Sequence, residues 1–267
     1  MKKRIIAALI TVSALALAAC SSKGKTADQK ADHLKRIQDA GKITIGLEGD
    51  WQPFSFHNEK DELVGYDVEV SRNIAKRLGV KADIVEGPWD GLFAGMDSGR
   101  YDIVVNGVDV TPERQKKYDF SDPYCYDHTV LIVKKGSSDV KTFDDLRGKT
   151  TANSIGSTYQ EIGEKYGASV KGVDTLVETL QMVKNGQVDA TINASTSFGD
   201  YMKQNPSDPL VVADTDKEAT EYAIPMEKGK DNASLKKAIN KALSDMRSDG
   251  TLKKLSVKYF GDDLTNK

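Results

Sequence analysis

Apolar side chains recur along this chain with two spacings, one that fits helices and one that fits strands. Residues 67–79 place Val70, Ile74 and Leu78 four positions apart and end in Gly79, which predicts an amphipathic helix with a glycine stop. A shorter helix of the same kind is predicted at 31–42.

Strand patterns lie between the helical ones. Apolar runs or alternations bounded by polar and turn residues occur at 42–48, 82–87, 102–108 and 129–133. Strands that alternate with helices in this way predict an α/β fold with largely parallel sheets.

An internal repeat suggests that the α/β pattern occurs twice. Met96–Asn106 and Val183–Asn193 share the frame G-x-x-D-x-x-x-N, with a helical pattern before each strand. Three matching residues can arise by chance, so the repeat alone is only suggestive. It nevertheless favours two lobes over one.

The segment after the apolar run 102–105 contains a helix start and an unexpected arginine. Thr111 is a good N-cap residue and Pro112 suits the first helical position. Arg114 then falls in the first turn, where a positive charge opposes the helix dipole. We therefore look for a role for Arg114 other than helix stability.

The first nineteen residues have the character of an export signal. Three basic residues precede an uncharged apolar stretch that ends in small residues, which is typical of a signal peptide at 1–19 and too short for a membrane span. The motif LAAC at 17–20 resembles a bacterial lipobox, which implies lipidation of Cys20 and anchoring to the membrane, as in a Gram-positive-type lipoprotein. Removal of 1–19 changes the formal net charge from −2 to −5, which argues against a nucleic-acid partner.

The remaining residue types exclude several kinds of chemistry. Cys125 is the one cysteine left after Cys20, so no internal disulfide is expected, and we interpret Cys125 as a small buried side chain. His33, His57 and His128 are scattered, and no metal-ligand cluster, G-x-S-x-G motif or phosphate loop is found. We expect no metal, no cofactor and no catalytic residue.

Several ordered stretches resemble the polar amino-acid solute-binding proteins of ABC importers, bacterial extracellular solute-binding protein family 3. The stretches that carry the resemblance are GYDVEVSRNIAKRL, DWQPFSF, WDGLFAGMDSGRYDIVV, TPERQKKYDFSDPY, LRGKTTANSIGSTYQE, VDATIN and DGTLKKLSVKYFG. They extend over nearly the whole chain after residue 20, and two of them look closest to the cystine-type subgroup.

The resemblance implies a type II periplasmic-binding-protein fold. Each of its two lobes would be a mostly parallel sheet flanked by helices, with a two-segment hinge between them. Lobe 1 would comprise residues 41–126 plus 226–267 and lobe 2 residues 127–225, after a lipidated N-terminus, tether and short helix at 20–40.

The same resemblance assigns roles to residues around the cleft. Arg114 occupies the position that pairs with the α-carboxylate of the ligand, and a guanidinium fork suits a carboxylate. Ser157 and Thr158 would bind the same carboxylate from the second lobe. Trp51 and Trp89 would form aromatic walls, although for Trp89 a place in the core, against the helix that follows, is a serious rival.

An ammonium group needs acceptors, and here the chain departs from the family pattern. Relatives usually carry an aspartate where this chain has Ala194, so either Asp109 binds the ammonium group or the ligand is not an ordinary α-amino acid. The residues that could assist Asp109 are Glu48, Asn106, Gly107 and Asn193. Asn193 is about as readily explained as a turn residue that closes its strand.

These observations lead to one main functional hypothesis and two alternatives. The chain is expected to be a monomeric, extracytoplasmic receptor that captures a small polar amino acid, cystine-type favoured, and delivers it to an ABC permease. An enzyme on the same fold, such as a cyclohexadienyl-dehydratase-like protein, is the first alternative, with Glu48 or Asp109 as a base. A stand-alone receptor that feeds a sensor is the second.

Overall fold

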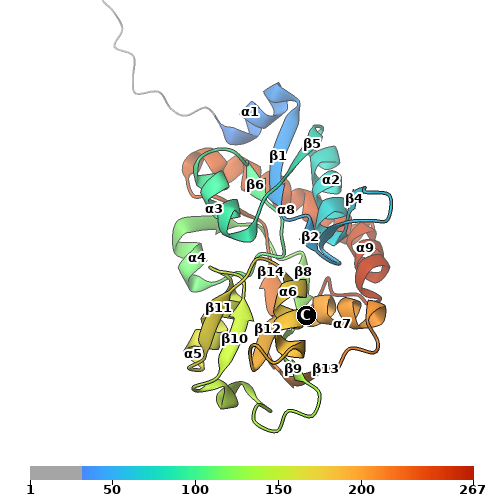
Figure 1. Cartoon of the computed structure of the whole chain (residues 1–267). Coiled ribbons are helices and arrows are strands. Elements are labelled where there is room, and N and C mark those ends of the chain that lie inside the picture. Colours follow the sequence, from blue (N-terminus) through green and yellow to red (C-terminus); the bar gives the residue numbers. More distant parts are fainter. Residues whose placement is uncertain (1–31) are drawn as a thin grey trace, which may run out of the picture. The chain divides into compact units, whose positions relative to one another are not determined.

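The computed structural model describes residues 32–267, in which helices flank parallel and mixed β-sheets (Figure 1). The predicted signal peptide, Cys20 and the tether lie outside the described residues. The helices are α1 (His33–Ala40), α2 (Tyr66–Leu78), α3 (Trp89–Asp97), α4 (Pro112–Lys117), α5 (Thr158–Lys165), α6 (Leu176–Lys184), α7 (Ser195–Gln204), α8 (Ala233–Ser248) and α9 (Thr251–Phe260), with 3₁₀ turns η1 (Phe143–Leu146) and η2 (Lys230–Asn232). Within residues 32–267 no helix is both long and apolar enough to cross a membrane.

The first sheet is short and fully parallel, as predicted. Its strands lie in the order β5 (Lys81–Glu86), β1 (Lys42–Leu47) and β6 (Ile103–Val104). Ile43 and Ile45 of the central strand are fully buried in a core shared with α2, α8 and α9. Ile43 and Ile45 are two positions apart and so point to the same face of the sheet, which explains the alternating apolar pattern of this strand.

The second sheet is mixed. Its order is β11 (Ser169–Gly172), β10 (Thr150–Asn153), β12 (Ala190–Ala194), β9 (Thr129–Lys134) and β13 (Leu210–Thr215). The first three strands are parallel, whereas β9 runs antiparallel to both of its neighbours. Because successive side chains of β9 point to opposite faces, it contributes to two apolar cores, one on each side of the sheet.

Three small antiparallel sheets complete the fold. One has three strands, β2 (Asp50–Trp51), β3 (Ser55–His57) and β4 (Leu63–Val64), and the others are the pairs β7 (Tyr118–Phe120) with β15 (Pro225–Glu227) and β8 (Cys125–Asp127) with β14 (Thr220–Tyr222). Since β8 directly precedes β9 and β14 follows β13, the chain passes between the sheets twice, side by side. The two passages agree with the predicted two-segment hinge.

The predicted helix ends are confirmed. Gly41 and Gly79 adopt the left-handed conformation directly after α1 and α2. The Thr111 side chain accepts a hydrogen bond from the Arg114 backbone N–H, with Pro112 as the first helical residue of α4. The strand predicted at 102–108 is shorter, because the chain turns at Gly107, which has a φ of +49°.

The two copies of the internal repeat make equivalent contacts in the structure. Asp102 and Asp189 each precede the strand of their unit, and each carboxylate accepts a hydrogen bond of 2.7 Å from the backbone of the neighbouring strand, at Thr44 N and Thr150 N respectively. The last residue of the frame, an asparagine in both copies, therefore emerges at an equivalent place in each sheet.

Candidate ligand-binding cavity

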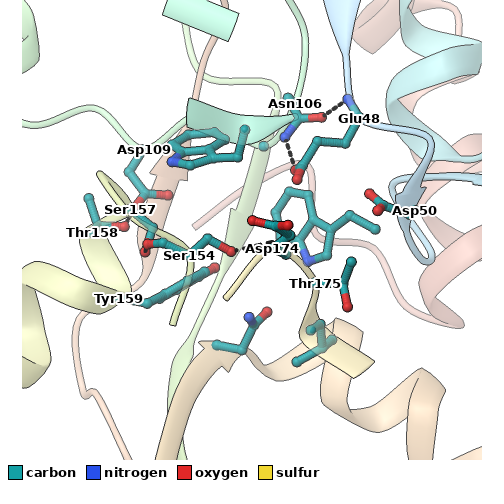
Figure 2. Close-up of a pocket in the computed structure, with 15 residues that line it drawn as sticks. Glu48, Asp50, Asn106, Asp109, Ser154, Ser157, Thr158, Tyr159, Asp174 and Thr175 are labelled. Atoms are coloured by element: carbon teal, nitrogen blue, oxygen red, sulfur yellow. Dashed lines mark hydrogen bonds between the residues drawn. The ribbon is translucent and has the colours of Figure 1, made fainter. Parts of the chain in front are cut away.

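A polar cavity lies where the ends of the two sheets meet (Figure 2). Most of the residues that line it lie in turns or helix starts that follow the carboxyl ends of β1, β5, β6, β10 and β11. Asn193 lies near the carboxyl end of β12, and Trp51 belongs to the short strand β2. Ligands of α/β proteins bind at this edge of parallel sheets, because the turns there bring free backbone groups and helix starts together.

Nine of the ten predicted ligand-binding residues line this cavity. They are Glu48, Trp51, Trp89, Asn106, Gly107, Asp109, Ser157, Thr158 and Asn193. Arg114, the tenth, is not among the lining residues.

Six further lining residues were not predicted. They are Asp50, Ser154, Tyr159, Asp174, Thr175 and Leu176. One signal for part of this set was present in the sequence: Thr175 precedes Glu178 by three positions, a helix-start pattern, and its side chain accepts a hydrogen bond from Glu178 N. The helix start at Thr175 means that the turn between β11 and α6 lies at the same edge of the sheet as the other turns that line the cavity.

Glu48 is the most buried carboxyl group of the β1 end. The residue is 9% exposed, and Asn106 Nδ2 donates a 2.7 Å hydrogen bond to Glu48 Oε2 while Glu48 N donates to Asn106 Oδ1. Burial raises the pKa of Glu48 to about 7, because the charged form loses solvation; the Asn106 hydrogen bond opposes the shift, and the nearby charges of Asp50 and Asp67 add to it.

Asp109 lies at the opposite side of the cavity in Figure 2, beside Ser157 and Thr158. The Thr158 hydroxyl donates to Asp109 Oδ2 and thus links the turn after β6 to the start of α5. Burial raises the pKa of Asp109 to about 6, although the positive charge of Arg114 and the Thr158 hydrogen bond act against it.

Arg114 is half-buried beside this end of the cavity. Its guanidinium donates to two backbone carbonyls, Asp109 O at 3.2 Å and Gly156 O at 3.4 Å. The guanidinium carbon also lies 5.2 Å from the ring centre of Trp89 and 5.4 Å from that of Phe93, which is cation–π geometry. Arg114 thus bridges the two sheets close to Asp109, from just outside the cavity.

The two tryptophans of the chain both contribute to the cavity wall. Trp51 is stacked on Phe54 with ring centres 4.3 Å apart, and it covers Gly107, where a Cβ atom would approach the indole to 2.6 Å. Only glycine therefore fits at position 107. Trp89 begins α3, lines the cavity and also packs against a core cluster, so both interpretations of Trp89 apply.

Ser157 and Ala194 show which groups the second sheet offers. Ser157 is the N-cap of α5, accepts a hydrogen bond from Gln160 N and donates one to Ser154 O. Ala194 is fully buried and does not line the cavity, whereas Asn193 next to it does. The second sheet therefore contributes hydroxyl and amide groups at these positions and no carboxylate.

A metal site and a reactive thiol each place requirements on the His, Cys, Asp and Glu side chains of residues 32–267. Residues 32–267 contain no group of three or more His, Cys, Asp or Glu side chains placed to hold a metal ion. Cys125 is fully buried, and burial raises the pKa of its thiol well above the usual range. His128 is exposed, so these two do not form a reactive pair.

Two sheets joined by paired crossing strands, with a polar cavity between their carboxyl edges, define the class of two-lobe solute-binding proteins. The chain belongs to the bacterial extracellular solute-binding proteins, family 3, whose profile matches residues 43–262. That family places the chain outside the cytoplasm.

Relatives and solved structures agree with this assignment. The chain is 39% identical over 270 residues to the L-cystine-binding protein TcyA of Bacillus subtilis (strain 168), covering 99% of this chain and 100% of TcyA. A mutant of ArgBP from T. maritima superimposes with a TM-score of 0.79 at 32% identity, over 86% of this chain and 100% of that one. The unliganded, open L-cystine solute receptor of Neisseria gonorrhoeae gives a TM-score of 0.59 at 35% identity, over 88% and 99%.

Proposed function

We propose that this protein binds a small polar amino acid, cystine-type favoured, in the cavity between its two sheets and delivers it to the permease of an ABC importer. The observation that carries the proposal is the composition of the cavity wall, in which carboxylates, hydroxyls and two indoles meet at the carboxyl ends of strands from both sheets. The similarity to cystine-binding and arginine-binding relatives supports an amino acid as the ligand.

The two ends of an amino acid would find complementary groups here. The α-carboxylate pairs with the Arg114 guanidinium and with the hydroxyls at the start of α5. A hydrogen bond to a charged group contributes roughly 1.5 to 3 kcal/mol, so a forked pair supplies a good part of the roughly 8 kcal/mol of micromolar binding. The ammonium group pairs with Asp109 or Glu48, since Ala194 offers no charge.

Ligand binding is coupled to movement of one lobe against the other in this proposal. The lobes are residues 41–126 plus 226–267 and residues 127–225. Thr158–Asp109 and Arg114–Gly156 are direct contacts across the gap. A ligand carboxylate replaces these contacts with charged ones and so stabilises the closed arrangement through its higher affinity for that form.

The cellular arrangement follows from the residues before the described part. We propose that residues 1–19 are removed as a signal peptide, that lipidated Cys20 anchors a monomer to the membrane, and that residues 21–31 act as a tether. Mass spectrometry of the membrane-bound protein tests this: an N-terminal diacylglyceryl cysteine at position 20 supports the anchor, and an unprocessed Met1 contradicts it.

A thermal-shift panel of the common amino acids plus cystine tests the ligand class. A bound ligand raises the unfolding temperature in proportion to the logarithm of its concentration over Kd, so even weak ligands register. We expect a polar amino acid to raise the unfolding temperature by several degrees, and a panel without any shift contradicts the proposal.

An enzyme on the same fold is a second candidate, because Glu48 has a pKa of about 7 inside a cavity and could act as a general base near neutral pH. Incubation with prephenate or arogenate tests it directly. Turnover that is lost in Glu48→Gln would favour the enzyme; binding without turnover favours the receptor.

A further inference from the structure

The residues that follow α9 return to the strands by which the chain passes between the two sheets. The backbone N–H of Tyr126 in β8 donates a 2.8 Å hydrogen bond to Leu264 O. Successive residues of a strand direct their backbone groups to opposite edges, so this bond uses the edge of β8 that faces away from its partner β14. Leu264 therefore lies beside β8 where a third strand would pair.

A second contact reaches the other crossing strand. Lys267 Nζ lies 2.5 Å from Glu221 Oε1, and Glu221 belongs to β14. The same ammonium group lies 5.9 Å from the ring centre of Tyr126, the residue opposite Glu221 in the β8–β14 pair. Residues 264–267 thus contact both crossing strands at the same level.

The base of this segment is fixed to the core of the first sheet. Leu264 N donates a 2.8 Å hydrogen bond to Ser256 Oγ of α9, and the Leu264 side chain packs against the core. Thr265 is 2% exposed, and its carbonyl accepts a 3.1 Å hydrogen bond from Arg247 of α8. Arg247 also donates to Pro123 O at 3.0 Å, just before β8. Both helices therefore hold the segment in place against the crossing strands.

These contacts act on the part of the molecule that has to bend when the lobes move. Hinge motion changes the backbone angles of the crossing strands and their positions relative to α8 and α9. The bonds from residues 264–267 are kept only while those positions are kept. The described arrangement also contains the bonds Thr158–Asp109 and Arg114–Gly156 across the gap. Both sets of contacts therefore favour the same arrangement of the lobes.

We propose that residues 264–267 form a hinge brace, which stabilises the arrangement in which the two cavity walls meet and so opposes opening of the lobes. The brace changes the balance between open and closed forms without touching a ligand, because all its contacts are to the crossing strands and to α8 and α9. The inference rests on the hinge motion of the proposed function and does not depend on which ligand binds.

Hydrogen exchange of the ligand-free protein measures the brace directly. Lys267→Met and Glu221→Gln each remove the ion pair and should speed exchange of the Tyr126 amide by about two- to fivefold, the effect of one exposed ion pair. The two changes together should have no more effect than either alone, because they remove the same interaction. Lys237→Met, at an exposed lysine of α8, is the matched control, and the amides of β12 should keep their wild-type rates in every variant.

Small-angle scattering of the same ligand-free proteins measures the hinge. Lys267→Met should have a larger radius of gyration than the wild type and Lys237→Met, because more molecules are open. The difference should disappear in about 1 M salt, where exposed charges are screened beyond about 3 Å. Titration with cystine provides a third measurement: affinity for Lys267→Met should be about two- to fivefold weaker at low salt, since fewer molecules are closed.

A Tyr126 amide that exchanges at the wild-type rate in both single variants would overturn the inference. Faster exchange with an unchanged radius of gyration would also overturn it, because the segment would then pair with β8 without controlling the hinge. If cystine does not bind the wild type, the result counts against cystine as the ligand of the proposed function, whereas exchange and scattering decide on the brace without any ligand.

Discussion

Arg114 combines features that an ordinary surface arginine lacks. Its guanidinium is held over Trp89 and Phe93 and donates to carbonyls that come from both sides of the cavity. Guanidinium remains charged when it is desolvated, and two neutral carbonyls do not neutralise it. An incoming carboxylate is the stronger acceptor, so exchange of these carbonyls for a ligand is favourable.

Replacing Arg114 by alanine should therefore abolish measurable ligand binding. Stability should change by less than about 1 kcal/mol, because the residue is only half-buried and outside every core cluster. Lys116→Ala, on the exposed side of the same short helix, is the matched control and should bind normally. Titration calorimetry with denaturant unfolding checks both properties; unchanged affinity in Arg114→Ala would refute the assignment.

Glu48 makes ligand affinity depend on pH near neutrality. Below its pKa of about 7 the group is protonated and neutral, and it no longer attracts a cation. Affinity should thus fall as pH decreases, by about tenfold between pH 8 and pH 6 if Glu48 contacts an ammonium group. Binding near pH 7 should also release protons, because the ligand cation lowers the pKa of Glu48.

Titrations at several pH values in two buffers of different ionisation enthalpy measure both effects. Glu48→Gln should flatten the profile between pH 7 and 8, with a residual slope near pH 6 from Asp109. A pH-independent affinity in the wild-type protein would show that neither carboxyl group senses the ligand's charge.

At the scale of elements, two buried hydrogen bonds through the Tyr124 hydroxyl connect α2 to the cavity. Asp67 in the first turn of α2 accepts a 2.7 Å hydrogen bond from the Tyr124 hydroxyl, which in turn accepts one from Gly107 N at 3.1 Å. Asp67 is fully buried, and burial raises its pKa to about 7. The family-like stretch that begins at Gly65 thereby positions the backbone at Gly107, which lines the cavity.

Tyr124→Phe should disturb stability and binding together. It leaves the buried Gly107 N–H and Asp67 Oδ1 without partners, which costs about 1–3 kcal/mol. Tyr126→Phe, two residues along on a half-exposed side chain, should change neither property. Denaturant unfolding measures the stability of both variants, and ligand titration measures their affinity. A Tyr124→Phe protein with wild-type stability would show that the hydrogen bonds of the Tyr124 hydroxyl do not stabilise the fold.

The elements with the clearest periodicity were predictable, and those set by contacts between distant residues were not. Amphipathic spacing and a terminal glycine suffice for α1 and α2, because both signals are local. The antiparallel direction of β9 depends on where the chain crosses between sheets, which no local pattern records. The two-residue strand β2 likewise exists through its pairing with β3.

The candidate site also contains residues that the sequence predicted and residues that only contacts between distant segments bring together. The resemblance led to Asn106 and Asn193, which hold the last position of the repeat frame in each unit, and both line the cavity. Asp50 begins the two-residue strand β2 and Asp174 lies in the turn before α6, and the two become neighbours only when the two sheets meet, so single-sequence patterns did not predict them. The position of Arg114 beside the cavity rather than in its wall also depends on that meeting of the sheets.

At the scale of the whole molecule, the described residues act as two sheets with one shared polar edge. The chain crosses between them through β8 and β14, which pair with each other, and we expect rotation about these strands to move one edge against the other. Closure of this kind is the hinge motion by which two-lobe proteins enclose ligands. The contacts of Thr158 and Arg114 across the gap are the ones that ligand would exchange.

Intrinsic fluorescence tests the central claim most directly, because the chain has two tryptophans and both line the cavity. Titration of the purified protein with amino acids, including cystine, should produce a saturable change in tryptophan emission for a polar amino acid, and the change should be absent in Arg114→Ala. Two results would contradict recognition of an amino acid at this cavity. In one, no amino acid changes the emission; in the other, amino acids change the emission of the Arg114→Ala variant as much as that of the wild type.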